Sequence, residues 1–353
     1  MFETLKSAFR VKEMRRKLLY LLVMIFIIRI GSQLPIPGVD SSVFKQWFKS
    51  NTGDAFNFFD AFTGGSFERM SIFALNITPY ITSSIIIQLL TIAIPALEEM
   101  QRDGEEGRKK MTAITRYVTV GLALFESIAM AIGFGRQGMI PDLDFFKGVV
   151  VVACLTAGSA MLMWLGERIT EKGVGNGISI VLTINIVSRI PSDMSLLYEN
   201  FVKGKTIAKG MLAACIIAVI ILFVVVLVLI LNGAERRIPV QYSKKMVGRK
   251  LMGGQSTNIP LKVNTAGVIP IIFSSSLMQF PIVIATFLGK DNGSGIGSEI
   301  LRGLNQSNWC NPEQIKYSWG LVLYIVLTVF FAYFYTSITF NPLEIANNMK
   351  KSG

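Results

Sequence analysis

The pattern of hydrophobic and polar positions along the chain predicts about eight membrane-spanning helices. A helix needs roughly 20 predominantly apolar residues to cross the hydrocarbon core of a bilayer. Runs of this kind lie near residues 18–36, 72–95, 113–135, 148–166, 174–190, 210–231, 264–288 and 318–339. The sequence therefore predicts an all-α polytopic membrane protein.

The second run, residues 72–95, differs from an ordinary lipid-facing helix. It contains a proline and several polar residues, namely Asn76, Thr78, Pro79, Tyr80, Thr82, Ser83, Ser84 and Gln88. Unsatisfied polar groups cost several kcal/mol in hydrocarbon, so a helix surrounded only by lipid would not carry so many. Ile77, Ile81 and Ile85 are four residues apart and share one helix face. This pattern indicates a helix that faces an internal, partly wet cavity.

The stretch before this run is short and amphipathic. It reads FNFFDAFTGGSFERM and is broken by Gly64 and Gly65. It is too short to cross a bilayer. We expect a broken half-helix that folds in front of the second run, is held by few contacts and can swing away.

The pattern of the second run recurs downstream. Residues 77–84 align with residues 268–275, so that the proline, the isoleucine two positions later and the paired serines coincide. A pair of proline-containing spans in two halves is typical of a repeat transport fold whose site lies between the halves. The alternative is two similar Ser-rich spans.

This alignment divides the chain into a first half, 1–191, and a second half, 192–353. The first half then holds five predicted spans and the second half three. Two further spans are therefore expected, and we interpret the chain as a fragment or a truncated form with eight of ten helices.

The composition supports a membrane protein and argues against an enzyme. The chain is 51% hydrophobic and 16% charged, whereas about a quarter of the residues in soluble domains are charged. Histidine is absent, which excludes His-based catalysis and His metal sites. The Gly-rich stretch 173–177 lacks the Lys-Ser/Thr of a phosphate-binding loop. We predict no catalytic, cofactor-binding or metal site.

The distribution of Lys and Arg predicts the orientation of the chain. Nearly twice as many lie in the amino-terminal head and the loops on its side as on the other side. Such residues accumulate on the cytoplasmic face, so the amino terminus is predicted to be cytoplasmic. We attribute the net charge of +12 to this signal rather than to DNA binding. Arg29, Arg116 and Arg189 lie near span ends, where we expect them to snorkel.

The loop 232–263 predicts a protruding basic hairpin. Extended pieces at 237–242 and 258–263 flank a Gly-rich basic middle, and both contain Pro, as exposed strands do. The loop is longer than topology requires, which favours a docking surface over charges that only fix topology. The candidate docking residues are Arg236, Arg237, Lys244, Lys245, Arg249 and Lys250.

Several stretches together carry a family resemblance. They read FERMSIFALNITPYITSSIIIQLL, GERITEKGVGNGISI, ERRIPVQY and GGQSTNIPLKVNTAGVIPIIFSSS, and with the closing SITFNPLEIANNMKK they cover most of the chain. The sequence resembles the SecY/Sec61-alpha family of protein-translocation channels. The resemblance implies ten spans in two inverted halves that form a passive channel. Such a channel moves unfolded polypeptides across the bacterial plasma membrane and releases transmembrane segments into lipid.

The resemblance also implies three groups of functional residues. A plug, 58–69, would include Phe58, Phe59, Phe62, Gly64, Gly65, Phe67 and Arg69. A pore ring would be formed by Ile77, Ile81, Ile178, Leu182 and Ile272. A lateral gate would be formed by Ile85, Gln88, Leu89, Ser275, Ser276 and Phe280. Leu182 and Glu126 depart from the Ile and the neutral Gln that the family implies.

The partners implied by the resemblance are the small subunits SecE and SecG, the ATPase SecA or the ribosome, signal peptides, unfolded preproteins and membrane lipid. Two other readings are an inverted-repeat secondary transporter of a small solute and a structural subunit without a pore. An ion-coupled transporter would be expected to carry more carboxylates near the midplane than the single Glu126.

Overall fold

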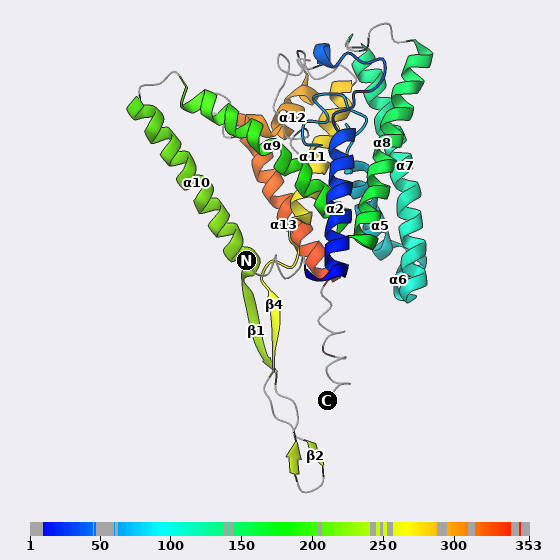
Figure 1. The fold of residues 1–353 in the computed structure, drawn as a ribbon, viewed down its shortest axis with the longest axis vertical. Helices are drawn as coiled ribbons and strands as arrows, with labels where there is room; N and C mark the ends of the chain where they lie inside the picture. Colours follow the sequence, from blue (N-terminus) through cyan, green and yellow to red (C-terminus); the bar gives the residue numbers. More distant parts are fainter. Residues whose placement is uncertain are drawn as a thin grey trace. The chain divides into compact units, whose positions relative to one another are not determined.

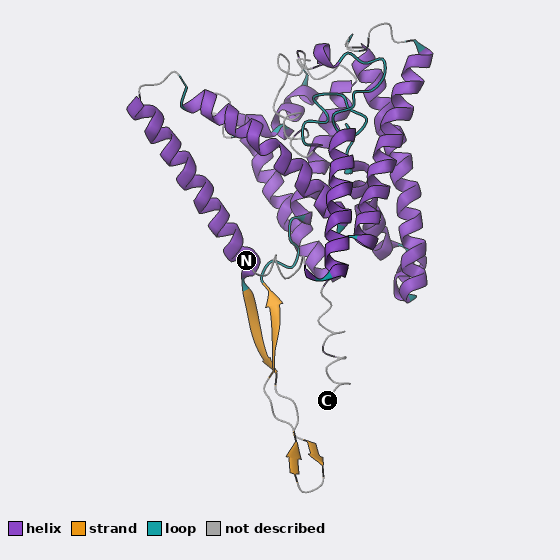
Figure 2. Cartoon of the chain, viewed as in Figure 1, coloured by secondary structure: helices purple, strands orange, loops and turns teal. Residues whose placement is uncertain are grey.

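The computed structural model describes residues 10–44, 46, 60, 63–136, 138, 140, 144–203, 207–240, 245–247, 250–252, 257–287, 295–309, 315–339 and 346. Helices predominate (Figures 1 and 2). They are α2 (Lys12–Gly31), α5 (Thr78–Ala93), α6 (Pro95–Arg102), α7 (Gly104–Arg136), α8 (Phe145–Lys172), α9 (Gly177–Phe201), α10 (Ile207–Gly233), α11 (Ile269–Phe287), α12 (Ile296–Leu304) and α13 (Trp319–Thr339), with short 3-10 turns η1 (Gln306–Asn308) and η2 (Ile315–Ser318). The strands are β1 (Glu235–Val240), β2 (Lys245–Val247), β3 (Lys250–Met252) and β4 (Thr257–Lys262).

Each of the eight predicted spans contains a helix. Among the described residues, five helices are long and apolar enough to cross a membrane. They lie in 104–135, 145–172, 177–199, 209–233 and 315–337. A sixth candidate is the pair Thr78–Thr91 and Pro95–Gln101, which is bent by 106°. The chain is therefore a multi-pass helical membrane protein.

The predicted second span begins later than expected. Residues 72–77 form turns, and α5 begins at Thr78 with Pro79 in its first turn. Proline suits this position because the first backbone N–H groups of a helix have no intrahelical partner. Pro270 likewise lies in the first turn of α11. The two aligned prolines start their helices rather than interrupt them.

The chain divides into two compact units that do not coincide with the predicted halves. The first unit contains residues 1–193 and 276–321, and the second contains 194–275 and 322–353. The boundary at 193 lies close to the expected one at 191. After residue 275 the predicted second half is divided, because residues 276–321 belong to the first unit and residues 322–353 to the second. The two-half repeat remains a prediction.

Helix packing in the first unit centres on α7 and α8. These helices pack against each other, α5 and α6 pack on α7, and α2 packs on α8 (Figure 1). The α8–α9 turn is tight, since a Cβ built at Gly177 would lie 1.9 Å from the carbonyl oxygen of Gly166. Glycine is required here because backbone meets backbone.

Two hydrophobic clusters form the core of the first unit. One contains Phe44, Phe67 and Phe134, whose rings meet edge to face or tilted, with centroids 4.9 to 6.1 Å apart. Such arrangements suit the ring quadrupoles. The other cluster joins α2, α5, α8 and α9 around Ile28, Leu162 and Ile169. Apolar side chains thus fix the bundle that supports residues 63–77.

The second unit contains α10 and the predicted hairpin. The most apolar 18 residues of α10 have a mean hydropathy of 3.8, and none of them is buried by protein. This suits a helix that faces lipid. The paired strands of the hairpin are confirmed, because β1 and β4 are antiparallel with Ile238 opposite Ile259. In the same unit, Phe273 packs edge-on against Phe331 with centroids 5.6 Å apart.

Candidate functional site

The described part of the predicted plug, Asp60 with residues 63–69, packs into the core of the first unit. Thr63, Ser66 and Phe67 are buried. Phe67 packs against Phe44 and Phe134. The expectation that this stretch is held by few contacts is therefore wrong for its described residues. Phe58, Phe59 and Phe62 lie outside the described residues.

The paired glycines allow this stretch to turn close to α9. Gly64 and Gly65 have φ of +67° and +80°, a region that favours glycine. A Cβ built at Gly64 would lie 2.7 Å from the backbone oxygen of Asn185 on α9, whereas one at Gly65 would meet nothing within 4 Å. Gly64 is thus required by both conformation and space, and Gly65 by conformation alone.

Asp60 is a fully buried carboxylate with several partners. One oxygen accepts hydrogen bonds from the backbone N–H of Glu68 at 2.9 Å and the Thr63 hydroxyl at 3.2 Å. The other oxygen forms an ion pair with Arg189 of α9. Burial raises the pKa of Asp60, and the Glu68 N–H and the Arg189 charge act in the opposite direction.

The three arginines that we expect to snorkel have different surroundings. The side chain of Arg189 is only 18% exposed and also contacts Asp193 of its own helix at 3.2 Å. Arg116 forms an ion pair with Glu167 at 2.8 Å. Arg29 has one buried guanidinium nitrogen without a hydrogen-bond partner among the described residues. Arg189 is therefore held by tertiary contacts, whereas the Arg116 side chain is 47% exposed. Snorkelling of the three arginines remains a prediction.

Asn76 lies two residues before α5, at the end of the plug stretch, by which we mean Asp60 and residues 63–76. Its φ is +53°, a conformation that Asn tolerates better than most residues. Its side-chain oxygen accepts a hydrogen bond from the Asn185 amide at 3.0 Å. Its backbone oxygen accepts one from the Ser159 hydroxyl at 3.2 Å. This buried residue therefore ties the start of α5 to both α8 and α9.

The predicted ring residues lie in both units. Ile77 is fully buried, and Ile81 and Ile178 are half-buried against the same hydrophobic cluster. Leu182 is half-buried one turn after Ile178 on α9. Ile272 lies on α11 in the second unit, where it is half-buried. The ring as a whole remains a prediction.

The predicted gate residues occupy α5 and α11. On α5, Ile85 and Leu89 are half-buried and Gln88 is exposed. On α11, Ser275 is buried and its hydroxyl bonds to the Ile271 carbonyl at 2.8 Å. The remaining two members, Ser276 and Phe280, are half-buried and exposed respectively. A gate between these helices remains a prediction.

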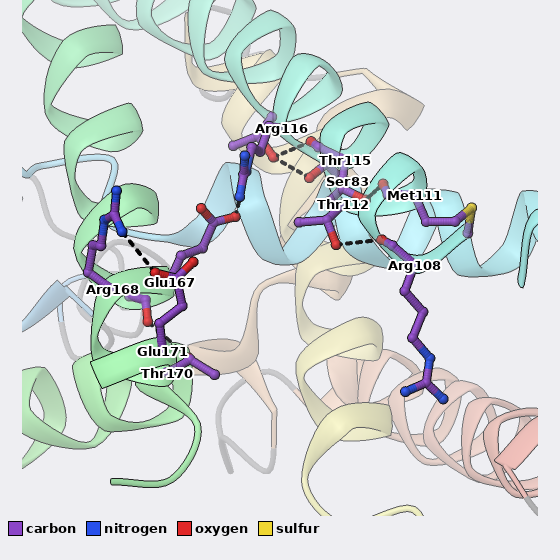
Figure 3. Close-up of polar contacts among 12 residues, drawn as sticks. Ser83, Arg108, Met111, Thr112, Thr115, Arg116, Glu167, Arg168, Thr170 and Glu171 are labelled. Carbon is purple, nitrogen blue, oxygen red and sulfur yellow. Dashed lines mark hydrogen bonds and ion pairs between the residues drawn. The ribbon is translucent and has the colours of Figure 1, made fainter. Parts of the chain in front are cut away.

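A polar belt joins α5, α7 and α8 (Figure 3). The hydroxyls of Ser83 and Thr119 are 2.5 Å apart, which links α5 to α7. The Arg116–Glu167 pair links α7 to α8 and is drawn near Ser83 in Figure 3. The Thr170 hydroxyl accepts a hydrogen bond from the N–H of Gly177 at 2.8 Å, which closes the turn into α9. These bonds make the bundle wall a connected unit.

The predicted docking residues lie on or beside the strands. Arg236 and Arg237 are on β1, opposite Leu261 and Pro260 of β4. Lys245 opens β2, and Lys250 opens β3. The other two, Lys244 and Arg249, lie outside the described residues. The docking role remains a prediction.

Sequence reasoning missed the polar contacts that secure the plug stretch. The sequence alone gives no role to Asp60 and predicts that the Asn76 amide faces a wet cavity. The sequence does contain one hint of this ion pair, because Asp60 and Arg189 carry opposite charges and each lies among apolar residues. The two are 129 positions apart, so the sequence did not specify that they pair.

Comparison with known proteins identifies the family. A family model described as SecY matches residues 71–353. The chain is 42% identical to the protein translocase subunit SecY of Streptomyces galbus, over 100% of this chain and 80% of that protein. Its identity to the same subunit of Escherichia coli K12 is 40%, over 97% of this chain and 75% of that protein.

Solved structures agree at the level of the fold. A structure titled as that of a protein conducting channel superposes with a TM-score of 0.65 at 18% identity, covering 91% of this chain and 71% of that one. Sec61 in a canine ribosome-channel complex from the endoplasmic reticulum also gives 0.65, at 19% identity, covering 94% and 75%. The chain therefore belongs to the SecY family and has the fold of a SecY/Sec61 channel.

Proposed function

We propose that this protein is the pore-forming subunit of the general protein secretion translocon. The observation that carries the proposal is the match over the whole chain to subunits named protein translocase subunit SecY. The fold supports it, because residues 63–77 form turns among the spanning helices rather than a span. A segment of this kind is suited to closing a channel.

The channel would pass polypeptides without binding them tightly. The branched aliphatic side chains of the proposed ring offer no hydrogen bonds, so an extended peptide can slide past them. An apolar constriction also dewets when empty and blocks ions. The proposed plug closes the empty channel, and the proposed gate between α5 and α11 lets apolar segments leave into lipid.

Energy for movement would come from a partner. SecA or the ribosome would drive the polypeptide, while SecE and SecG would complete the complex. The titles of two neighbouring structures support a ribosome partner, since they describe Sec61 and Ssh1 channels with ribosomes. The basic residues of β1, β2 and β3 fit such a partner because ribosomal RNA is strongly negative. On this proposal the chain itself is not an enzyme.

The proposed location is the bacterial plasma membrane with a cytoplasmic amino terminus. The excess of Lys and Arg on the amino-terminal side supports this orientation. The same orientation places the strands β1 to β4 on the cytoplasmic side, where SecA and ribosomes are found.

Reconstitution tests the proposed function directly. The protein would be placed in proteoliposomes with SecE and SecG and supplied with SecA, ATP and a radiolabelled preprotein. We expect the preprotein to become protease-resistant only when ATP and this protein are both present. Vesicles without this protein are the control. Solute uptake along an ion gradient, with no protected preprotein, would overturn the proposal in favour of a secondary transporter.

A further inference from the structure

Arg189 lies between two carboxylates on different parts of the fold. One nitrogen of its guanidinium pairs with Asp60 of the plug stretch, and another is 3.2 Å from Asp193 one turn further along α9. Guanidinium groups present several donors in a fixed plane and can hold two carboxylates at once. The plug stretch and α9 therefore share this cation.

The two carboxylates differ in their surroundings. The side chain of Asp60 is fully buried, whereas that of Asp193 is 48% exposed. Asp60 also accepts bonds from Thr63 and Glu68, so it organises the turn that contains Gly64. The buried pair holds the plug stretch, while the exposed pair is local to α9.

A second contact lies one turn away on the same face of α9. Asn185 is four residues before Arg189, and its amide bonds to Asn76 at the other end of the plug stretch. Its backbone oxygen lies against Gly64. Asp60 and residues 63–76 are thus fastened to α9 at residues 185 and 189.

We propose that Arg189 is a latch for the plug: it pairs with both Asp60 and Asp193 in the closed channel and keeps Asp193 as its partner when the plug is released. The inference rests on the proposed channel function. Leaving one member of a buried ion pair without a partner is strongly unfavourable. Asp193 lowers this penalty because it stays on the same helix as Arg189 when Asp60 leaves. It therefore makes release easier, whereas Asp60 makes release harder.

The latch predicts opposite effects for the two carboxylates. Asp60→Asn removes the partner of the closed state and favours release. Asp193→Asn removes a partner from both states, but it leaves Arg189 unpaired only in the released state, so it disfavours release. A merely structural role for these charges predicts that both changes loosen the plug.

Thiol labelling measures release without any transport step. Ser66 is buried, so Ser66→Cys in a background in which the three native cysteines are replaced should react slowly with a maleimide. The protein would be assayed in membranes with its partner subunits. We expect labelling to rise roughly 10- to 100-fold with Asp60→Asn and to fall several-fold with Asp193→Asn. Arg189→Gln should raise it, and Arg189→Lys should restore it in part.

The matched control is Glu199→Gln. Glu199 forms an exposed ion pair with Lys203 at 3.3 Å, also between residues four apart, and should leave labelling unchanged. Faster labelling in both Asp60→Asn and Asp193→Asn, or no change in either, would overturn the latch. Labelling needs no preprotein, so the expected labelling pattern supports the latch even if reconstituted transport fails. Successful transport without this labelling pattern would reject the latch and leave the proposed channel function intact.

Discussion

Asn185 donates its side-chain amide to the side-chain oxygen of Asn76 at 3.0 Å, across 109 positions of sequence. Both residues are buried, at 3% and 1% exposure. Asn76 lies two residues before α5 and Asn185 lies on α9, so the bond connects the end of the plug stretch to the helix that carries Arg189.

We expect Asn185→Ala to destabilise the protein by ~1–3 kcal/mol, because it leaves the Asn76 side chain buried without this donor. Asn76→Gly keeps the positive φ of +53° accessible and removes the same bond. In a double-mutant cycle on thermal unfolding in detergent, the combined variant should lose clearly less than the sum of the single losses. Additive losses would show that the bond contributes nothing.

The paired glycines offer a comparison of conformation against space. Alanine at either position meets the left-handed penalty of about 1–2 kcal/mol. Gly64→Ala also brings a Cβ to 2.7 Å from the Asn185 oxygen, whereas Gly65→Ala meets open space. Gly64→Ala should therefore release the plug more and raise ion conductance further in planar bilayers. Equal conductance in the two variants would contradict the observed close approach.

The ring prediction is tested by ion leak. Ile81→Gly and Ile272→Asn should loosen the seal and raise conductance of the idle channel, since a smaller or polar side chain lets water enter the constriction. Ile128→Gly on α7 is the control, because Ile128 is 42% exposed and belongs to neither cluster. Conductance that matches this control would remove both residues from the ring.

The docking prediction concerns Lys245 and Lys250 on the short strands β2 and β3. Reversing both to Glu should weaken binding of SecA or ribosomes and flatten its salt dependence, because surface charges are screened over about 10 Å at 0.1 M salt. Reversal of Lys203 and Lys209, predicted to lie on the opposite side, is the control. Unaltered binding at low salt would leave the hairpin charges as a topology signal only.

The turn between α8 and α9 tolerates no side chain at Gly177. Gly177→Ala would place a Cβ 1.9 Å from the Gly166 oxygen, and backbone cannot move aside without separating the helices. We expect a lower unfolding temperature and poor accumulation in membranes. Gly121→Ala on α7 is the matched control, since its Cβ meets nothing within 4 Å and alanine favours helix by up to ~1 kcal/mol.

The sequence by itself determined the class of protein and the place of its helices. Apolar length is a local property, so each predicted span contains a helix, from α2 to α13. The strand pairing of β1 with β4 also followed from two nearby extended pieces joined by a short basic middle. The family followed from stretches whose order and spacing are themselves sequence.

Only the tertiary structure decided which polar groups meet. The periodicity of the sequence predicts the helix face of Asn76 but not its hydrogen bond with Asn185. It likewise predicts that Arg189 lies near the end of a span but not that it pairs with Asp60. The contacts of the plug stretch were also underestimated, because burial of Phe67 depends on Phe44 and Phe134 from distant segments. The local sequence shows that a buried polar side chain requires a partner, because an unpaired polar group is costly in the low-dielectric interior. Which residue is that partner depends on the long-range fold.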